Sequence, residues 1–253
     1  MDTQPSSLGD HLRDWRRRRR MSQLDLAAEA DISTRHLSFV ETGRSQPSRD
    51  MVIRLAQRLE VPLRDRNHML IAAGYAPAYP EKPLDDPDLK PAMAAIERLL
   101  AAHAPNPALA VDRHWTLLAA NEAIAPLIAG AAPQLLEPPV NVLRLSLHPD
   151  GLAPRIRNLG EWRAHIIERL RGQAEATADP VLDRLVAELE AYPGRASTRR
   201  PDDHYAGLAV PLHIEDSAGR LHSFISTTTV FGAPLNVTLS EIAIESFLPI
   251  GTR

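Results

Sequence analysis

The chain has 253 residues, of which 44% are hydrophobic and 24% are charged, a composition typical of a soluble globular protein with one or two domains. It contains no cysteine, which excludes disulfide bonds, thiolate metal ligands and cysteine nucleophiles. No stretch approaches the roughly 18 apolar residues of a membrane span, and no apolar run follows the N-terminal arginines as in a secretory signal. We therefore expect a cytoplasmic protein without membrane insertion.

The formal net charge of −3 is unevenly distributed along the chain. Residues 1–75 carry thirteen arginines against ten acidic residues, whereas residues 76–253 carry sixteen basic and twenty-two acidic residues. A basic surface for an anionic partner is therefore expected in the N-terminal part.

The first expected helix follows from the spacing of Leu8, Leu12 and Trp15, which places the three side chains on one buried face. The run Arg16–Arg20 spans more than one helical turn, so its members point in every direction. Most of these arginines are expected to be solvated, and one or two could reach phosphates.

Two short helices are expected on either side of Asp31, where the helical period breaks and restarts. Ser22 is a favourable N-cap for the first of them, with Asp25 three residues on, and Ser33 is a favourable N-cap for the second. A tight corner often needs a residue of positive φ, which Asp31 tolerates better than most side chains but less well than glycine.

Two further helices complete an expected set of five. One follows the Ser48 cap and buries Val52, Leu55, Ala56 and Leu59. The other runs from about Leu63 to Ala73 and closes on Gly74.

The segment SQLDLAAEADISTRHLSFVETGRSQPS resembles the phage-repressor (XRE) family of helix-turn-helix domains, and the resemblance extends over about Leu8–Gly74. It implies an all-α, five-helix, phage-repressor-like fold that binds double-stranded DNA. The departure is Asp31, where the family usually has glycine.

In such a module the second of the two short helices enters the major groove, where each base pair presents its own pattern of donors and acceptors. Thr34, Arg35 and Ser38 would then face base edges, and Arg35 could bond a guanine. Phe39 could touch a thymine methyl or be partly packed, while His36 fits a solvated or phosphate-side position. The full set of expected DNA contacts is Gln23, Ser33, Thr34, Arg35, His36, Ser38, Phe39, Arg44 and Arg49, of which Gln23, Arg44 and Arg49 are the phosphate candidates.

Five prolines between Tyr75 and Pro91 indicate a semi-rigid connector. We therefore expect a DNA-binding domain at 1–78, a linker at 79–91 and a second domain at 92–253. Within the second domain, Tyr192–His204 is expected to be a mobile surface loop.

The second domain mixes helical and strand patterns, which predicts an α+β fold with a small antiparallel sheet covered on one face by helices. Such a sheet and its helices can leave a cavity between them. Helices are expected at Glu122–Ile128, Glu161–Arg171 and Val181–Glu190, and in a segment with Met93, Ile96, Leu99 and Leu100 on one side. Hairpins are expected at 108–119 and 207–231, and a capping box at Thr238–Glu241 predicts a final helix that ends near Pro249.

The segments VDRHWTLLAANEA, NVLRLSLHPDGL, EWRAHIIERLR and STTTVFGAPLNVTLSEIAIESFLP resemble the MmyB-like ligand-binding domain, a PAS-like module, over about residues 90–248. That resemblance implies a small lipophilic effector such as a fatty acid. The candidate ligand contacts on these segments are Trp115, Asn121, Asn141, Arg144, His148, Trp162, Thr229 and Phe231.

Most of these candidates also have a purely structural interpretation, as core aromatics (Trp115, Trp162, Phe231), helix caps (Asn121, Asn141) or a turn beginning at His148. Arg144 lies in an apolar segment and, if buried, requires an acidic or carbonyl partner. That partner could be a ligand carboxylate or a protein side chain, for which Glu137, Glu241 and Glu245 are the candidates.

Two alternatives to a second domain that binds a small effector remain, namely a metal site and a protein-partner module. Glu161, His165 and Glu168 have a spacing that could bind a metal, but neighbouring arginines favour a salt-bridged surface. His204, His213 and His222 have no acidic pattern around them, so we expect no catalytic residue, metal site or cofactor. The second domain could instead be a dimerisation or protein-partner module. Together these features predict a homodimeric transcription regulator.

Overall fold

The computed structural model describes residues 6–193 and 209–250, which form two compact units. The N-terminal unit ends at Lys82 and also includes Pro234–Ser240. The C-terminal unit comprises Pro83–Ala233 and the chain from Glu241 onward. The break after Lys82 lies inside the connector expected at 79–91. Across the described ranges, no helix combines the length and apolarity needed to cross a membrane.

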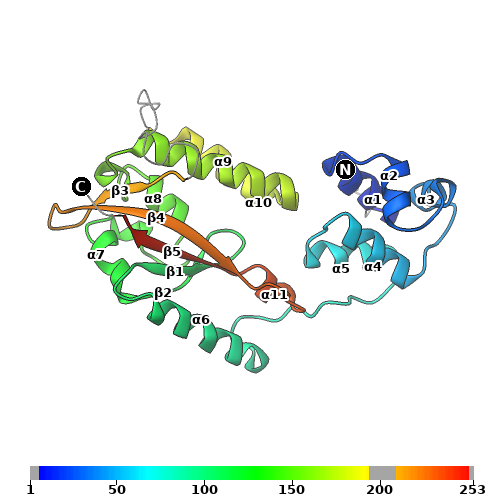
Figure 1. The fold of residues 1–253 in the computed structure, drawn as a ribbon, viewed down its shortest axis with the longest axis horizontal. Coiled ribbons are helices and arrows are strands. Elements are labelled where there is room, and N and C mark those ends of the chain that lie inside the picture. Colours follow the sequence, from blue (N-terminus) through cyan, green and yellow to red (C-terminus); the bar gives the residue numbers. More distant parts are fainter. Residues whose placement is uncertain (1–5, 194–208, 251–253) are drawn as a thin grey trace. The chain divides into compact units, whose positions relative to one another are not determined.

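Five helices form most of the N-terminal unit, as predicted (Figure 1). They are α1 (Leu8–Arg18), α2 (Gln23–Glu29), α3 (Thr34–Glu41), α4 (Arg49–Arg58) and α5 (Leu63–Ala72). The first four begin at serines whose hydroxyls accept a hydrogen bond from the backbone N–H three residues on, namely Ser7, Ser22, Ser33 and Ser48. Such caps satisfy donors that have no partner inside the helix, so local sequence fixes these four starts.

The corner between α2 and α3 lies at Asp31, as predicted. Asp31 has a φ of 54°, in the left-handed region. The N–H of Ile32 donates to the carbonyl of Ala27 at 3.0 Å and closes the end of α2. Ser33 then caps α3, so the two short helices meet in a tight turn.

The core of the N-terminal unit contains most of the apolar residues that the helical spacing placed inward, among them Leu12, Trp15, Leu37, Val40, Val52, Leu55 and Leu59. Helices α1 and α3 approach each other closely at Gly9. A Cβ atom added at this glycine would lie 2.2 Å from the carbonyl oxygen of Glu41, the last residue of α3. Only glycine fits there.

The N-terminal unit is completed by Pro234–Ser240, which contains the short helix α11 (Val237–Ser240) and packs on α5. The N–H of Val237 donates to the carbonyl of Pro80 at 2.8 Å, and the hydroxyl of Thr238 donates to the carbonyl of Lys82 at 2.6 Å. These bonds join the end of the N-terminal chain segment to a segment more than 150 residues away in sequence.

The prediction of a final helix from Thr238 to near Pro249 is wrong. After one turn of helix in α11, the chain forms strand β5 (Ala243–Pro249). The turn is capped by Asn236, whose side chain accepts from Leu239 N, because the Thr238 hydroxyl bonds Lys82 instead. Strand β5 pairs with a strand on each side, and these long-range bonds override the local helical pattern.

The C-terminal unit is built on one antiparallel sheet with the strand order β2-β1-β5-β4-β3. Its other strands are β1 (Ala108–Val111), β2 (Leu117–Ala120), β3 (Leu212–Glu215) and β4 (Leu221–Val230). Both predicted hairpins, β1–β2 and β3–β4, are confirmed. The loop expected at 192–204 lies mostly outside the described residues.

Helices surround this sheet. They are α6 (Lys90–Ala102), α7 (Ala125–Ile128), α8 (Val142–Leu147), α9 (Leu159–Thr177) and α10 (Pro180–Ala191), with 3-10 turns at Pro87–Leu89, Glu122–Ile124, Pro133–Leu135 and Ala153–Arg155. Helix α9 is longer at both ends than the Glu161–Arg171 segment that the apolar spacing predicted.

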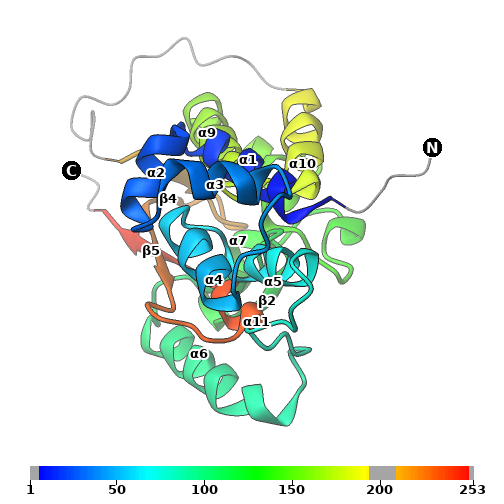
Figure 2. The same cartoon turned by 90° about the vertical axis from the view of Figure 1, so that its right-hand side faces the viewer.

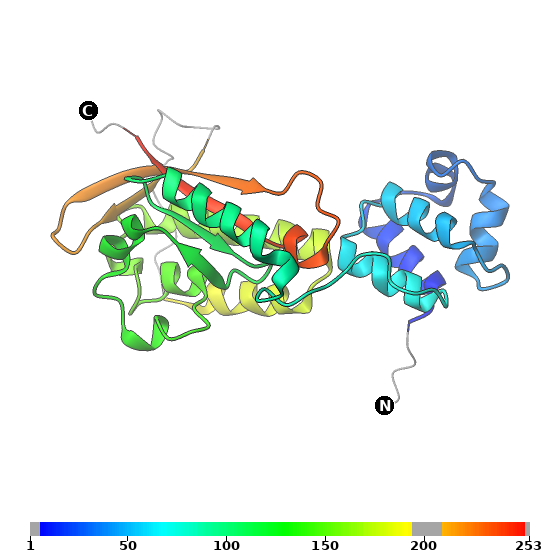
Figure 3. The ribbon, with the colours of Figure 1, turned by 90° about the horizontal axis from the view of Figure 1, so that it is seen from below.

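The sheet is covered on both faces, whereas one covered face was predicted. Helices α9 and α10 lie on one side of the sheet and α6 on the other (Figures 2 and 3). Neighbouring residues of β5 show this directly, because Glu245 bonds Arg169 of α9 while the Ser246 hydroxyl lies 3.0 Å from His103 Nε2 at the end of α6. Helix α6 buries Ile96 and Leu100, but Leu99, predicted on the same side, is 45% exposed.

Gly9→Ala is expected to destabilise the protein by about 1–3 kcal/mol or more, because the added methyl group meets backbone of α3 that cannot rotate away. The matched control is Gly172→Ala in α9, where a Cβ would have nothing within 4 Å and should stabilise by about 0.5–1 kcal/mol. Urea denaturation of the two variants measures both effects, and a Gly9→Ala protein as stable as the wild type would contradict the close approach.

Candidate nucleic-acid interface and ligand cavity

The outward face of α3 carries the three predicted base-contacting side chains. Arg35 is exposed, and Thr34 and Ser38 are half-buried, while Leu37 and Val40 on the opposite side are buried. Packing of the apolar side against α1 and α2 therefore leaves a polar strip of α3 at the surface.

Arg35 is held over an aromatic ring. Its guanidinium carbon lies 5.4 Å from the centre of the Phe39 ring, in cation–π geometry. Phe39 is itself half-buried, so it is both partly packed and available to orient Arg35. This contact restricts the flexible arginine before any partner arrives.

The remaining predicted DNA contacts occupy different positions. The Ser33 hydroxyl is used as the cap of α3, accepting from His36 N at 3.1 Å. The His36 ring turns toward α4, with Nε2 3.3 Å from the sulfur of Met51. Arg44 and Arg49 are exposed, the latter at the first position of α4.

Gln23 takes part in an interaction that the sequence did not reveal. Its side-chain nitrogen donates to Oε2 of Glu41 at 2.8 Å, and the same carboxylate receives Nε of Arg16 at 2.8 Å and Nη2 at 3.0 Å. One carboxylate thus joins α1, α2 and α3. One amide hydrogen of Gln23 remains for a further acceptor.

Glu41 is 2% exposed and nevertheless charged. Burial opposes the charge, but the hydrogen bonds from Arg16 and Gln23 outweigh it and hold the pKa of Glu41 below its ordinary value. The negative charge in the core of the unit is therefore compensated by the Arg16 guanidinium.

The arginine run divides into structural and exposed members. Besides Arg16, Arg19 is engaged, donating to the carbonyls of Leu59 and Glu60 at 2.9 and 3.1 Å. Arg17, Arg18 and Arg20 are exposed and form no ion pair within the described part of the chain. Most of the run is therefore a solvated basic surface, as expected.

The C-terminal unit contains a cavity of about 250 Å³ between the sheet and its helices. Its walls consist mostly of leucine, isoleucine and valine side chains from β1, β2, β3, α7, α8 and α9. Trp115 and Trp162, two of the predicted ligand contacts, line it. The polar side chains in the wall are Ser146, His165, Arg169, Ser226 and Glu245.

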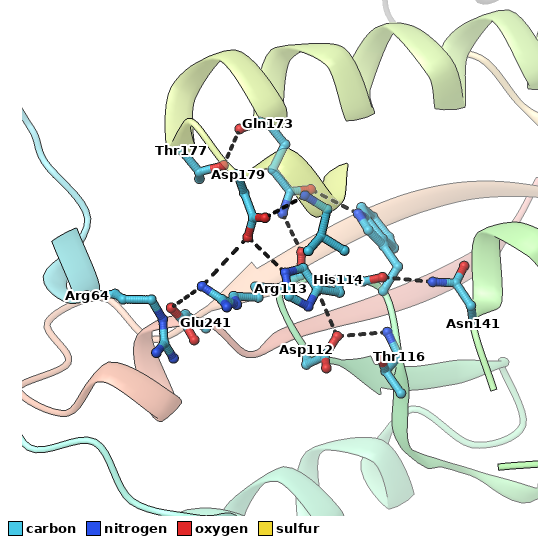
Figure 4. Close-up of polar contacts among 12 residues, drawn as sticks. Arg64, Asp112, Arg113, His114, Thr116, Asn141, Gln173, Thr177, Asp179 and Glu241 are labelled. Atoms are coloured by element: carbon cyan, nitrogen blue, oxygen red, sulfur yellow. Dashed lines mark hydrogen bonds and ion pairs between the residues drawn. The ribbon is translucent and has the colours of Figure 1, made fainter. Parts of the chain in front are cut away.

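Trp115 reaches the cavity from a strained backbone. Its φ of 67° is uncommon for a bulky residue. The preceding turn is held by Asp112, whose carboxylate accepts from the N–H groups of His114 and Thr116 at 2.8 Å each (Figure 4). The indole N–H of Trp115 donates to Gln173 at 2.9 Å, which fixes the ring against α9.

A charged cluster anchors this turn to the start of α10 (Figure 4). Nε2 of His114 lies 2.8 Å from Asp179 Oδ2, and Nη1 of Arg113 lies 3.6 Å from the same oxygen and 3.5 Å from Glu241. Burial of Asp179 opposes its charge, but the hydrogen bonds from His114 and from the N–H of Val181 lower its pKa overall. This cluster positions the wall of the cavity without lining it.

The polar part of the cavity wall contains an ion pair whose carboxylate is buried. Arg169 donates from Nη1 to Oε2 of Glu245 at 3.0 Å and from Nη2 to Oε1 at 2.6 Å, and Nη2 also donates to the Thr228 hydroxyl at 2.7 Å. The guanidinium lies 4.7 Å from the centre of the Trp115 ring. The Glu245 side chain is 4% exposed and the Arg169 side chain 33%.

The other six predicted ligand contacts do not line the cavity. Asn121 bonds the backbone of Leu100, Asn106 and Ala108, and Asn141 caps α8 and bonds the carbonyl of His114. Arg144 forms a surface pair with Glu188 at 2.7 and 2.8 Å, so none of its three proposed protein partners is correct. His148 lies in a turn against Tyr192, Thr229 is exposed on β4, and Phe231 is half-buried beyond its end.

No group of three or more metal-ligating side chains forms within residues 6–193 and 209–250. Of the three residues with metal-like spacing, His165 lines the cavity, whereas Glu168 is exposed on α9. His213 lies 2.7 Å from the Ser223 hydroxyl and His222 3.0 Å from Asp216, while His204 lies outside the described residues.

The five-helix unit, with α2 and α3 joined at a tight corner, has the arrangement of a helix-turn-helix domain. Residues 7–69 match a model of the helix-turn-helix domain, and residues 92–252 match the model of the MmyB-like transcription regulator ligand binding domain. The chain belongs to this MmyB-like family. Because the second model describes transcription regulators, the chain belongs to a class of regulators and not of enzymes.

Curated relatives agree with this class. The chain is 33% identical over 115 residues to the uncharacterized HTH-type transcriptional regulators Rv0023 of Mycobacterium tuberculosis and Mb0023 of Mycobacterium bovis. The matched segment covers 43% of this chain and 38% of the length of each relative.

Glu41→Gln is expected to destabilise the protein by about 1–3 kcal/mol at pH 7, because the largely buried Arg16 guanidinium loses its counter-charge. Since the pKa of Glu41 is lowered in the folded state, its stabilisation is fully present above the unfolded pKa of about 4.3 and is lost as the pH falls through the folded pKa. Urea denaturation from pH 7 to pH 3 should therefore show the two proteins converging in stability. A constant difference over this range would contradict the assignment.

Proposed function

We propose that the protein binds specific sequences of double-stranded DNA by placing α3 in the major groove. The polar strip of Thr34, Arg35 and Ser38 at the surface of a helix held at a tight corner is the observation that carries this proposal. The major groove admits one α-helix, and a guanidinium can bond the O6 and N7 atoms of guanine together. The exposed Arg44 and Arg49, and the free amide hydrogen of Gln23, suit phosphate oxygens.

One such module covers about half of an operator, so we propose a homodimer on a near-palindromic site. The half-sites would lie roughly 34 Å apart, or a multiple of that distance, because each turn of B-DNA returns the major groove to the same face. The cytoplasm, where bacterial DNA lies, is the corresponding location.

We further propose that the cavity of the C-terminal unit binds a small lipophilic effector that modulates DNA binding. Its walls are almost entirely apolar, and its volume of about 250 Å³ lies just below the roughly 300–1,000 Å³ of typical ligand pockets. A short fatty-acid-like chain suits such walls. The family resemblance implies the same class of molecule.

The chain offers a route from the cavity to the DNA-binding helices. Strands β4 and β5 carry Ser226 and Glu245 into the cavity wall, and the segment between the two strands is Pro234–Ser240, which belongs to the N-terminal unit. If this segment can adopt a second arrangement, an effector that binds the two arrangements with different affinities would shift the equilibrium between them and so regulate DNA binding.

A second candidate function for the C-terminal unit is dimerisation or binding of another protein without a metabolite. Exposed apolar side chains on β4 and β5 favour it, namely Leu221, Val230 and Leu248. Native mass spectrometry of the purified protein distinguishes the two candidates, because a co-purified lipid supports the effector and a dimer without any bound molecule supports the alternative.

Arg35→Ala is expected to weaken binding to the cognate operator roughly 5- to 150-fold, because one good bidentate base contact is worth about 1–3 kcal/mol. Binding to random DNA should change far less. The operator is first identified by genome-wide recovery of bound fragments, and affinities are then measured by fluorescence anisotropy.

Arg44→Ala is the matched control, since a phosphate contact carries no sequence information and its loss should weaken both DNAs similarly. The slope of log affinity against log salt should fall by about 0.9 for this variant. Equal losses on operator and random DNA for Arg35→Ala would show that Arg35 contacts phosphate and does not read bases.

Val142→Phe is expected to fill part of the cavity and to abolish co-purification of a lipid. Val142 is a half-buried residue of α8 in the cavity wall. The control is Val186→Phe on α10, which makes the same change in a half-buried valine outside the wall. Retention of the lipid in Val142→Phe, measured by native mass spectrometry, would contradict the assignment of the effector to this cavity.

A further inference from the structure

We propose that the polar end of the cavity binds an uncharged head group that both donates and accepts hydrogen bonds, such as a hydroxyl or a primary amide, and discriminates against a carboxylate. This inference rests on the proposed function, because it specifies the head group of the lipophilic effector, and it departs from the fatty acid that the family resemblance implies.

The charges in the cavity wall already cancel. The wall contains one cation, Arg169, and one anion, Glu245, joined by two hydrogen bonds of 3.0 and 2.6 Å. The Thr228 hydroxyl, which accepts from Arg169, also donates to Glu245 at 2.9 Å. The guanidinium has therefore no uncompensated charge to offer a ligand.

His165 does not add a positive charge. It lies one helical turn before Arg169 on α9, and burial, followed by the charge of Arg169, lowers the pKa of its imidazole. A neutral imidazole supplies one donor and one acceptor.

A ligand carboxylate would be costly in this setting. It would have to share the Arg169 guanidinium with Glu245, which leaves two carboxylates and one cation in a mostly apolar cavity. Like charges that share a site disfavour ionisation, and an uncompensated buried charge is expensive. An uncharged head group avoids both costs.

The wall does have hydrogen-bonding capacity to spare. Ser146 is occupied, since its hydroxyl oxygen accepts from the indole N–H of Trp162 at 3.1 Å. In contrast, the side chains of His165 and Ser226 form no hydrogen bond with the described part of the chain. An imidazole and a hydroxyl can together satisfy a head group with a donor and an acceptor, and the apolar walls would surround its alkyl chain.

The test compares octan-1-ol, octanamide and octanoate on the full, delipidated chain at pH 7.5, using the fluorescence of the wall residues Trp115 and Trp162. The six- and ten-carbon members of each series provide a length control. We expect the alcohol and the amide to bind at least tenfold more tightly than the carboxylate of equal length. Equal or tighter binding of the carboxylate overturns the inference and leaves the proposed effector function intact, whereas no binding in any series counts against that function itself.

Glu245→Gln is expected to reverse the preference for the alcohol over the carboxylate. It removes the competing carboxylate and leaves Arg169 unpaired, so octanoate should gain at least tenfold while octan-1-ol changes little. An unchanged preference in a folded Glu245→Gln protein overturns the inference.

Ser226→Ala tests the head group without disturbing the ion pair. It should weaken octan-1-ol about fivefold, the loss expected for one hydrogen bond. Thr229→Ala, which changes an exposed hydroxyl on the same strand, should have no effect. Equal affinities in the wild type and Ser226→Ala would overturn the assignment of this hydroxyl to the head-group site.

Discussion

The carboxylate of Glu41 is the point on which the N-terminal unit depends. Glu41 is the last residue of α3, and its carboxylate accepts hydrogen bonds from Arg16 of α1 and Gln23 of α2. The backbone carbonyl of the same residue lies against Gly9. Three helices therefore meet at one residue, through an ion pair and through a backbone approach that excludes any side chain. The outward direction of α3, and with it the place of Arg35, follows from this packing and not from contact with a partner.

The C-terminal unit also buries a carboxylate that is paired with an arginine, here Glu245 with the half-buried Arg169. Arg169 and Glu245 join α9 to the central strand β5 and form part of the wall of an apolar cavity. Removing either side chain would leave the charge of the other without compensation, so the charge of each residue depends on the presence of its partner. Because the charges of Arg169 and Glu245 compensate each other, the shape of the walls and the uncharged polar groups beside the pair select among ligands.

Local signals explain what could be predicted from the sequence. Serine caps, apolar spacing and the strained Asp31 all act within a few residues, and they located the five N-terminal helices and the corner. The segment after Thr238 shows the limit, because its local pattern is helical while pairing on both edges makes it strand β5. Likewise, spacing could not distinguish Arg144 from Arg169, because only the packing of α8 and α9 directs one to the surface and the other to the cavity.

The inclusion of Pro234–Ser240 in the N-terminal unit means that the chain passes between the units three times, after Lys82, after Ala233 and after Ser240. A protein cut once at the proline-rich connector would thus not yield two intact halves. The shorter piece would expose the carbonyls of Pro80 and Lys82 and the surface of α5 that α11 covers, and the longer piece would carry an unsupported crossover between its two longest strands. Dissection of this regulator into modules therefore needs a graft of the crossover onto the N-terminal piece, and a single cut does not suffice.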